Sequence, residues 1–554
     1  MNALTRRACA RACACALLLL ELSSAAHAAS SVASVPYLRK QGSATQLMVN
    51  DQPLLILGGE LHNSSASSLA YLDKLWPTLK AAELNTLVAP VEWDQIEPVE
   101  GRYDFTVLDG MLQQARAHNT HLLLLWFGAW KNSMSTYVPA WIKRDSQRFP
   151  HALSRTGEPQ EILTPFGAAT LAADTAAFKA MLAHLKQADT QRTVVMIQVE
   201  NEIGMLPDVR DYSGAANAAY RGAVPAALTA YLGAHKDTLK PVLKSQWESH
   251  GSRASGTWSE VFGDTVETEE MFQAWHYAAF VESMTAAGKA VYPLPMYVNV
   301  ALNRPGKRPG DYPSAGPLPH LFDIWKAGAP AIDVLAIDTY FPNFIHWAKQ
   351  FKRPDNPLFI PEANHAERPD AGADAFYAIG EHDAFGFSPF AIDDIKDGNS
   401  SLPRAYRVLK QLTPIINQYQ GSGNMHGFKA PMSFEGVVDT TPQQVTMGGY
   451  TLDVSFNAPW ERADPATLQT RGGLVIRTGE DEFIVAGKGL TVVFKSALKD
   501  GAMVGFEKLT EGTYQDGRWK EGRWMNGDES HQGRHVGLSS DDFTIQRVKL
   551  YRYR

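Results

Sequence analysis

The chain has 554 residues, of which 45% are hydrophobic and 20% are charged, and its formal net charge is −7. This length and composition suit two or more folded domains with apolar cores and exclude a disordered chain. The mild acidic excess makes nucleic acids and anionic membrane surfaces poor partners. Beyond the N-terminal segment, no apolar run approaches the roughly 20 residues that cross a bilayer, so we expect no membrane span.

The first 28 residues have the pattern of a secretory signal peptide. Arginines near the start precede an apolar stretch over residues 12–20, and Ala26-His27-Ala28 offers small residues at a cleavage site. We expect cleavage after Ala28 and a periplasmic or secreted protein, with twin-arginine export through Arg6-Arg7 as an alternative route. Since all the cysteines lie in this segment, the mature protein would have no disulfide and no cysteine-bound metal. They are Cys9, Cys13 and Cys15.

Short apolar runs alternate with amphipathic stretches from about residue 54 to residue 420. This alternation is typical of repeated βα units around a parallel sheet. We count eight runs, the number that a (β/α)8 TIM barrel requires, and we predict a barrel domain over residues 29–420. The runs are Leu54–Leu57, Thr86–Pro90, Leu122–Phe127, Val194–Val199, Pro295–Val300, Val334–Thr339, Leu358–Pro361 and Ala384–Phe390.

Stretches between and after these runs carry apolar residues at helical spacing. The runs are spaced most widely after the third and the fourth, which predicts insertions beside the carboxyl ends of those strands. We expect Asp208–Glu270, in the second insertion, to build part of a substrate cleft, with a purely structural addition as the alternative. The helical stretches are Leu69–Leu84, Leu108–His118, Thr175–Lys186, His320–Ala327 and Arg404–Gln418.

The composition changes after Gln420, where Gly421-Ser422-Gly423 opens a region of short β-rich runs. Regularly spaced short strands of this kind favour an all-β sandwich or jelly roll. We predict such a C-terminal domain over residues 421–554. The expected strands include Gly473–Arg477, Phe483–Ala486, Leu490–Phe494 and Phe543–Tyr551.

Carboxylates follow two of the apolar runs where each buried strand would end. The fourth run leads into Glu200-Asn201-Glu202, and the seventh run leads into Glu362. The carboxyl ends of barrel strands meet at one mouth, where barrel enzymes keep their chemistry. A retaining glycosidase needs one carboxylic acid and one carboxylate about 5 to 5.5 Å apart at such a place. The two acids therefore predict cleavage of a glycosidic bond.

Strand alternation separates the two glutamates of the first motif. Glu202 lies nearer the mouth, and Glu200 is two residues deeper on the same face of the strand. We therefore predict that Glu202 reacts and that Glu200 is a supporting carboxylate, hydrogen-bonded within the barrel.

The segment Gln198–Gly204 closely resembles the acid/base motif of glycoside hydrolase family 35, the β-galactosidases. Further segments are similar to strand-end motifs of that family: Gly58–His62, Trp93 with Glu97-Pro98, and Pro139–Trp141. The Asn-Glu pair after strand four is shared by the whole clan of retaining barrel enzymes to which the family belongs.

The resemblance implies a role for each matching residue. Glu202 would be the general acid/base and Glu362 the nucleophile. Asn201 would hydrogen-bond the sugar 2-hydroxyl, an interaction that strengthens in an oxocarbenium-like transition state. Tyr340 would donate a hydrogen bond to the nucleophile and so keep it ionised.

Two segments depart from the family pattern. Ala89–Trp93 and Gly128–Lys131 stand where many members carry residues that contact the sugar. The sequence is more similar to a bacterial branch of the family that is linked to plant cell-wall polysaccharides, including xyloglucan side chains.

Other residues at predicted strand ends are candidates for sugar contact, with core packing as the alternative for each. Aromatic rings can stack on the apolar face of a pyranose, and polar side chains can bind its hydroxyls. The aromatic candidates are Trp93, Trp126, Trp130, Trp247 and Phe387, and the polar candidates are Asn299, His62, Glu60 and Glu92.

Together these features predict a retaining exo-β-galactosidase that releases terminal galactose from plant oligosaccharides such as xyloglucan fragments. The mechanism calls for no metal or cofactor, an oligosaccharide is the expected partner, and the oligomeric state is left open. One alternative is a related glycosidase that prefers an arabinoside, mannoside or glucoside. Another is a catalytically silent carbohydrate-binding protein on the same scaffold.

Overall fold

The computed structural model describes residues 34–457, 461, 464–498 and 501–554. The predicted signal peptide and its cysteines lie outside these residues. Val35–Arg554 forms one compact unit. Within the described part of the chain, no helix is both long enough and apolar enough to span a membrane.

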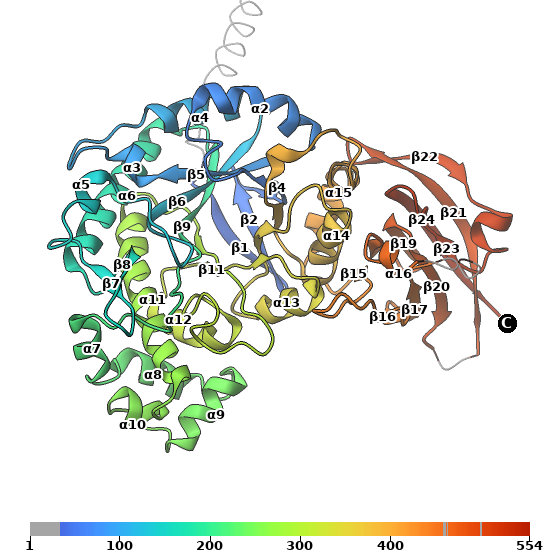
Figure 1. The fold of residues 1–554 in the computed structure, drawn as a ribbon. Helices are drawn as coiled ribbons and strands as arrows, with labels where there is room; N and C mark the ends of the chain where they lie inside the picture. Colours follow the sequence, from blue (N-terminus) through green and yellow to red (C-terminus); the bar gives the residue numbers. More distant parts are fainter. Residues whose placement is uncertain (1–33, 458–460, 462–463, 499–500) are drawn as a thin grey trace, which may run out of the picture. The chain divides into compact units, whose positions relative to one another are not determined.

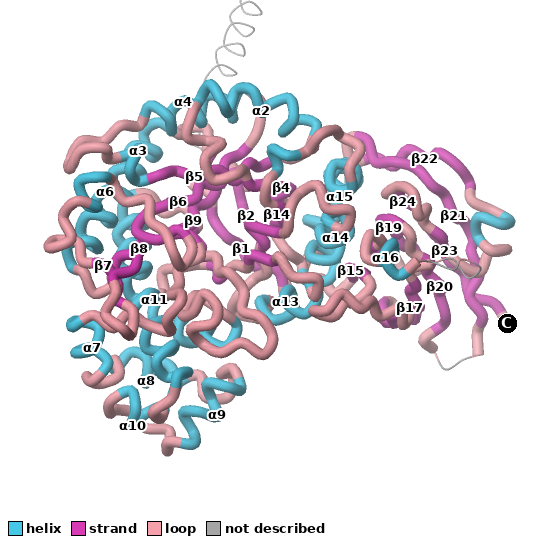
Figure 2. The backbone as a smooth tube through the Cα atoms, in the orientation of Figure 1, coloured by secondary structure: helices cyan, strands magenta, loops and turns pink. Residues whose placement is uncertain are grey.

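A nine-stranded parallel sheet curls into a TIM-barrel-like core with helices around it (Figures 1 and 2). Its order is β11-β10-β9-β6-β5-β4-β14-β13-β12. The first and last of these strands are two pieces of the predicted sixth run, so the two ends of the sheet meet there. The strands are β4 (Ile56–Glu60), β5 (Thr86–Glu92), β6 (His121–Lys131), β9 (Val194–Asn201), β10 (Met296–Val298), β11 (Val334–Leu335), β12 (Asp338–Thr339), β13 (Ile360–Ala363) and β14 (Gly386–Pro389).

The predicted fold class is confirmed, since each of the eight runs contributes to this sheet. The domain limits at residues 28 and 420 stay a prediction. The helices that follow the strands are α2 (Leu69–Ala81), α3 (Trp93–Ile96), α4 (Thr106–Ala117), α5 (Ala140–Lys143), α6 (Ala168–Ala188), α11 (Val266–Val291), α12 (Phe322–Gly328), α13 (Phe344–Phe351), α14 (Ala371–His382) and α15 (Ser401–Tyr419).

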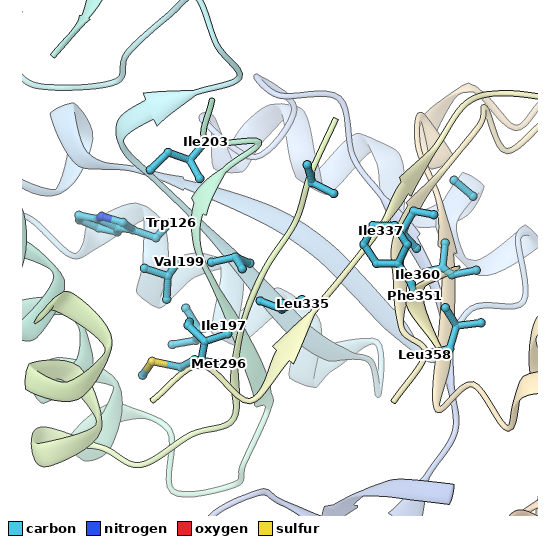
Figure 3. Close-up of a cluster of buried hydrophobic side chains, with 14 of the residues drawn as sticks. Trp126, Ile197, Val199, Ile203, Met296, Leu335, Ile337, Phe351, Leu358 and Ile360 are labelled. Atoms are coloured by element: carbon cyan, nitrogen blue, oxygen red, sulfur yellow. The ribbon is translucent and has the colours of Figure 1, made fainter. Parts of the chain in front are cut away.

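Apolar side chains fill both sides of the barrel wall. Between the strands and the outer helices, Trp126, Ile197 and Leu335 belong to a continuous buried cluster (Figure 3). A second cluster fills the barrel interior, where Leu125 and Phe359 pack with Leu47. Burial on both faces explains why the strands read as continuous apolar runs.

The sequence analysis missed a small antiparallel sheet before the barrel. It consists of β1 (Tyr37–Gln41), β2 (Ala44–Val49) and β3 (Gln52–Leu54), and its middle strand supplies Leu47 to the barrel interior. Left-handed backbone at Asn50 and Asp51, with φ of 51° and 60°, makes the tight turn into β3. The predicted first run therefore straddles the end of β3 and the start of β4.

Both predicted insertions are present. The first carries a hairpin of β7 (His151–Leu153) and β8 (Pro159–Leu163). The second forms a group of helices before α11. They are α7 (Gly214–Tyr220), α8 (Ala226–Ala234), α9 (Pro241–Ser249) and α10 (Trp258–Phe262).

The C-terminal region is all-β, as predicted, and consists of two antiparallel sheets around a shared apolar core. Next to the barrel, Phe376 of α14 stacks on Phe543 with ring centroids 5.3 Å apart. The larger sheet has β15 (Met425–Lys429), β18 (Gly472–Arg477), β19 (Glu482–Lys488), β24 (Thr544–Tyr553), β21 (Met503–Gln515) and β22 (Arg518–Trp524). The smaller has β16 (Gln443–Met447), β17 (Tyr450–Ser455), β20 (Thr491–Ser496) and β23 (Val536–Gly537).

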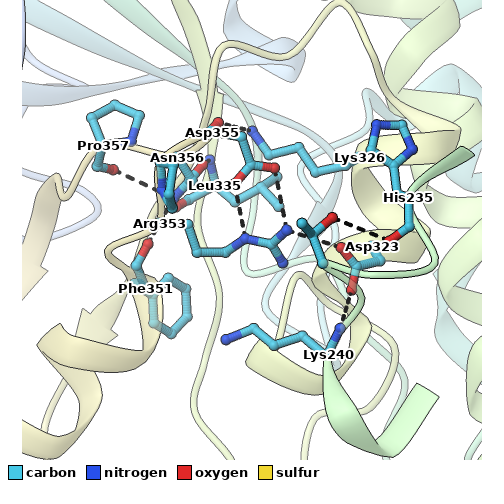
Figure 4. Close-up of polar contacts among 12 residues, drawn as sticks. His235, Lys240, Asp323, Lys326, Leu335, Phe351, Arg353, Asp355, Asn356 and Pro357 are labelled. Carbon is cyan, nitrogen blue, oxygen red and sulfur yellow. Dashed lines mark hydrogen bonds and ion pairs between the residues drawn. The ribbon is translucent and has the colours of Figure 1, made fainter. Parts of the chain in front are cut away.

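A buried ion pair ties the helical insertion to the barrel (Figure 4). Arg353, which follows α13, contacts Asp323 of α12 at 3.0 Å and Asp355 at 2.8 Å. Asp323 also accepts the backbone N–H of Lys240, at the start of α9, at 2.7 Å. The Asp323 side chain is 1% exposed, so this carboxylate is held by protein donors rather than by water.

We predict that Asp323→Ala destabilises the fold by about 3 to 5 kcal/mol, because it leaves the Arg353 charge buried without its main partner. Equilibrium unfolding in urea measures the change. Glu100→Ala is the matched control, since it breaks an ion pair with Arg148 in which both side chains are about half exposed. The control should leave the unfolding midpoint unchanged. Equal midpoints for the two variants would contradict the anchoring role of Asp323.

Candidate active site

The two predicted reacting acids lie at the same mouth of the barrel. Glu202 follows the last residue of β9, and Glu362 lies in β13. The negative charge of Glu362 acts on Glu202 and is the second largest cause of its altered pKa, after burial. The arrangement therefore brings together the pair that the sequence analysis singled out.

The end of β9 does not follow the regular alternation that we assumed. Glu200 and Glu202 both have left-handed backbone, with φ of 62° and 44°. Non-glycine residues rarely adopt this conformation, and such positions concentrate at functional sites. The twist turns the two carboxylates to different sides of the strand, so the expectation that they share a face is wrong.

Glu200 faces helix α6 rather than the mouth. Its carboxylate accepts the backbone N–H of Trp130 at 2.8 Å and of Ala129 at 3.3 Å. Asp174 of α6 lies beside it and accepts the Trp126 indole N–H at 2.8 Å. Burial and the Asp174 charge raise the pKa of Glu200 well above its usual range. This pair of acids therefore holds a proton and fixes the end of β6 against α6.

Asn299 positions the backbone of Glu202. Its side-chain oxygen accepts the Glu202 N–H at 2.8 Å, and its amide nitrogen donates to Asp338 at 2.7 Å and to Asn201 at 3.3 Å. Both ends of the Asn299 amide are thus occupied within the protein. The contact of Asn299 with a sugar hydroxyl stays a prediction.

Asn201 is fully buried beside Glu202. Its side-chain oxygen accepts from Gln198 at 2.8 Å, which fixes the orientation of the amide. Its nitrogen has no acceptor within the described part of the protein. A donor is therefore left over next to the reacting acid.

Glu202 is tuned to carry a proton near neutral pH. Burial, followed by the charge of Glu362, raises the pKa of Glu202 to about 7. Lys131 and a hydrogen bond with Asp338 act in the opposite direction. A carboxylic acid with such a pKa is suited to general acid/base chemistry.

Glu362 has two close partners. The hydroxyl of Tyr340 donates to its Oε1 atom. Glu60, at the end of β4, shares a side-chain hydrogen bond with Glu362, and burial followed by the Glu362 charge raises the pKa of Glu60 well above its usual range. Burial raises the pKa of Tyr340 as well, so its phenol stays a donor. Glu362 therefore takes part in hydrogen bonds with both Tyr340 and Glu60.

The sequence analysis missed Lys131 and Asp338. Lys131, at the end of β6, is 8% exposed, and its positive charge lowers the pKa of Glu60, Glu202 and Asp338. Asp338 joins the cluster from β12, and burial raises its pKa well above the usual range. Lys131 lies in one of the segments that depart from the family pattern. That departure was the signal by which the sequence could have indicated Lys131 as a site residue.

Most of the predicted aromatic platforms are core residues. Trp93 and Trp130 have no exposed surface, and Trp247 is 6% exposed. Trp93 donates to Glu97 at 2.9 Å, Trp247 donates to the carbonyl of Arg253 at 3.0 Å, and Trp130 packs edge-on against aromatic rings of α11. These rings pack within the protein, as in the core-packing alternative, and their contact with sugar stays a prediction. The other two candidates, Trp126 and Phe387, are also fully buried.

His62 and Glu92 lie at the rim of the mouth. The His62 ring, 42% exposed, contacts Asp393 at 3.1 Å and meets Phe390 edge-on at 5.1 Å. Glu92 ends β5, where burial and then the charge of Asp94 raise its pKa to about 7. Both side chains remain candidates for sugar contact.

A cavity of about 400 Å³ opens beside Glu202. Asp338 and Tyr340 line it on the same side as Glu202, and residues 301–313, after β10, form much of the remaining wall. The predicted wall, Asp208–Glu270, instead supports this loop from behind. Glu270 accepts the hydroxyl of Tyr312 at 3.0 Å. The segment does not line the cavity because the helices of the insertion pack on one another and on α12, away from the mouth.

A TIM-barrel-like fold with two interacting glutamates at its mouth is an arrangement that glycoside hydrolases use. Residues 71–287 match a family model described as Beta-galactosidase, the glycoside hydrolase family 42 model. This part of the barrel is therefore similar to the β-galactosidases that the model describes. The match also corrects the resemblance to family 35, because the matching model is that of family 42.

A second model, described as a domain of unknown function (DUF5597), matches residues 402–537, from α15 into the β region. No curated protein matches the chain.

Several solved structures are similar to the chain at low identity. A β-galactosidase from Bacillus circulans sp. alkalophilus has 17% identity and a TM-score of 0.42, over 66% of this chain and 56% of that one. A β-galactosidase from Rahnella sp. R3 has 15% identity and a TM-score of 0.44, over 71% and 59%. The chain thus spans less than two thirds of the length of these enzymes. Likenesses of this level assign no substrate.

We predict that Lys131→Met shifts the alkaline limb of the pH profile of kcat/KM to higher pH. Loss of the positive charge raises the pKa of Glu202 further, so the acid keeps its proton over a wider range. Initial rates on an aryl β-galactoside across pH measure the shift. Lys520→Met, an exposed lysine in β22, is the control and should leave the profile in place. A limb that stays fixed or moves to lower pH in Lys131→Met would contradict the electrostatic role of this residue.

Proposed function

We propose that this protein is a retaining exo-β-galactosidase, with Glu202 as general acid/base and Glu362 as nucleophile. The observation that carries the proposal is the different surroundings of the two acids. Glu202 has its pKa raised to about 7, whereas Glu362 accepts hydrogen bonds from Tyr340 and Glu60. Double displacement needs one protonated and one ionised carboxyl group in this arrangement.

In the first step, Glu362 attacks the anomeric carbon and forms an ester with the sugar. The bond to the leaving-group oxygen breaks, and Glu202 donates its proton to that oxygen. In the second step, Glu202, now a carboxylate, takes a proton from water. The resulting hydroxyl attacks the anomeric carbon, and Glu362 leaves as a carboxylate. Two inversions give overall retention of configuration.

The remaining polar groups act through orientation and charge. Asn299 holds the backbone of Glu202, and Asn201 offers its free amide N–H groups to the sugar 2-hydroxyl. The positive charge of Lys131 lowers the pKa of Glu60 and of Asp338 and so limits the repulsion among the acids.

Galactose as the released sugar is supported by the family model that matches the barrel. Plant oligosaccharides such as xyloglucan fragments, and a periplasmic or secreted location, are carried forward from the sequence alone. A panel of aryl galactosides, arabinosides, mannosides and glucosides tests the sugar. Preferential hydrolysis of another member of the panel would replace galactose in the proposal.

Substitution of the two acids tests the mechanism. We predict that Glu362→Ala abolishes measurable turnover of an aryl β-galactoside. Glu202→Ala should slow turnover of galactosides with poor leaving groups by about 10²- to 10⁴-fold, because proton donation is lost. Glu158→Ala, an exposed acid in the first insertion, is the control and should behave as the parent enzyme.

Azide distinguishes retention from inversion in Glu202→Ala. The small anion needs no general base, so it should attack the galactosyl ester and release β-galactosyl azide. An α-configured azide product, or full activity in either acid variant, would overturn the assignment.

A further inference from the structure

The cavity beside Glu202 lies on the leaving-group side of the proposed reaction, and the inference below rests on that proposal. Its lining includes Glu202 together with Asp338 and Tyr340. A general acid must reach the oxygen of the departing group. The space that continues outward from Glu202 is therefore where the departing group lies. Its volume, about 400 Å³, falls in the usual range of ligand sites.

One aromatic ring forms the outer wall of this cavity. Phe341 follows Tyr340 at the end of the sixth barrel run, lines the cavity and is partly exposed. The Arg304 guanidinium lies over this ring, 5.8 Å from its centroid. Phe341 thus differs from the buried tryptophans, because its ring is open to a ligand at the mouth.

Besides Arg304, a residue of the C-terminal region also packs against the Phe341 ring. Phe434 meets Phe341 edge-on, with ring centroids 5.2 Å apart and an interplanar angle of 62°. Phe434 lies in a tight turn after β15, where Ser433 donates to the carbonyl of Val437 at 2.9 Å. The turn is further closed by a bridge between Met432 and Val438. The loop therefore presents Phe434 in a fixed position against the barrel mouth.

The charges of the cavity wall are mixed. Arg304 lines it together with Asp311, Glu202 and Asp338. A wall with both signs and a partly exposed ring suits a neutral sugar, whose apolar face stacks while its hydroxyls meet charged hydrogen-bonding groups. An anionic sugar would face two carboxyl groups of the reacting cluster.

We propose that Phe341, supported by Arg304 and by Phe434 of the C-terminal region, is the stacking platform for the neutral sugar that leaves in the reaction. The C-terminal region thereby takes part in substrate selection. The enzyme then distinguishes oligosaccharides from galactosides with small leaving groups.

The test compares two substrates that share the galactose but differ in the leaving group. β-Galactosyl fluoride releases only fluoride and so reports on the galactose position and the nucleophile. Lactose releases a neutral sugar that must occupy the cavity. Phe341→Ala should lower kcat/KM on lactose by about tenfold, the scale of one aromatic stacking contact, and change turnover of the fluoride less than twofold.

Phe434→Ala provides a second variant whose ring lies in a surface turn outside the barrel. It should produce a smaller loss of the same selectivity. Val437→Ala is the matched control from the same turn, with a side chain that is 70% exposed, and should leave both substrates unchanged.

Transfer to an acceptor gives an independent readout. When the parent enzyme is supplied with β-galactosyl fluoride and excess glucose, galactosyl-glucose should form beside free galactose. Phe341→Ala should lower the ratio of transfer to hydrolysis, because the acceptor uses the same platform. Unchanged selectivity and unchanged transfer in both phenylalanine variants would overturn the inference. Absence of any turnover of the fluoride by the parent enzyme would instead overturn the proposed function.

Discussion

Electrostatic repulsion among buried carboxyl groups governs this active site. Glu60, Glu202, Asp338 and Glu362 crowd together at the end of the barrel, and each is largely withdrawn from water. Neighbouring carboxyl groups cannot all ionise in a medium of low polarity, because their negative charges repel one another. Protons must therefore remain on some of the acids. Lys131 lowers the pKa of Glu60, Glu202 and Asp338, and Tyr340 donates a hydrogen bond to Glu362. In the proposed mechanism this distribution separates the acid from the nucleophile.

The scaffold holds these groups through backbone geometry and hydrogen bonds rather than through apolar contacts alone. The left-handed residues at the end of β9 send Glu200 toward α6 and Glu202 toward the mouth. Such conformations are costly for glutamate, and they persist where the surroundings determine them fully. Asn299 holds the backbone of Glu202 through a hydrogen bond. Two residues earlier in β9, the contact with Asp174 holds Glu200.

The eight barrel strands, the all-β C-terminal region and the two strand-end acids could all be predicted from sequence, because each leaves a local pattern of apolar runs and turns. Asp338 could not be found, since a single charged residue at a strand end gives no sign that it is buried among acids. For Lys131 the signal was its place in a segment that departs from the family pattern. The tryptophans were misassigned because composition does not tell which face of a strand end they occupy. The family was misassigned because the Asn-Glu motif is common to a clan and reports the chemistry rather than the lineage.

In the proposed mechanism each region of the chain has a separate role. The barrel supplies the reacting acids, the loop after β10 walls the cavity, and α11 supports that loop through Glu270. The all-β region reaches the same cavity through Phe434. Substrate choice then depends on both regions, whereas the bond-breaking chemistry depends on the barrel.

The central claim, that Glu362 is the ionised nucleophile of this cluster, is tested most directly by trapping the covalent intermediate. 2-Deoxy-2-fluoro-β-galactosyl fluoride slows both steps but keeps a good leaving group, so the galactosyl ester should accumulate and be detected by mass spectrometry. Peptide mapping should locate the label on Glu362. A label on Glu60 or another acid, or the lack of any covalent adduct during turnover of this reagent, would contradict the account.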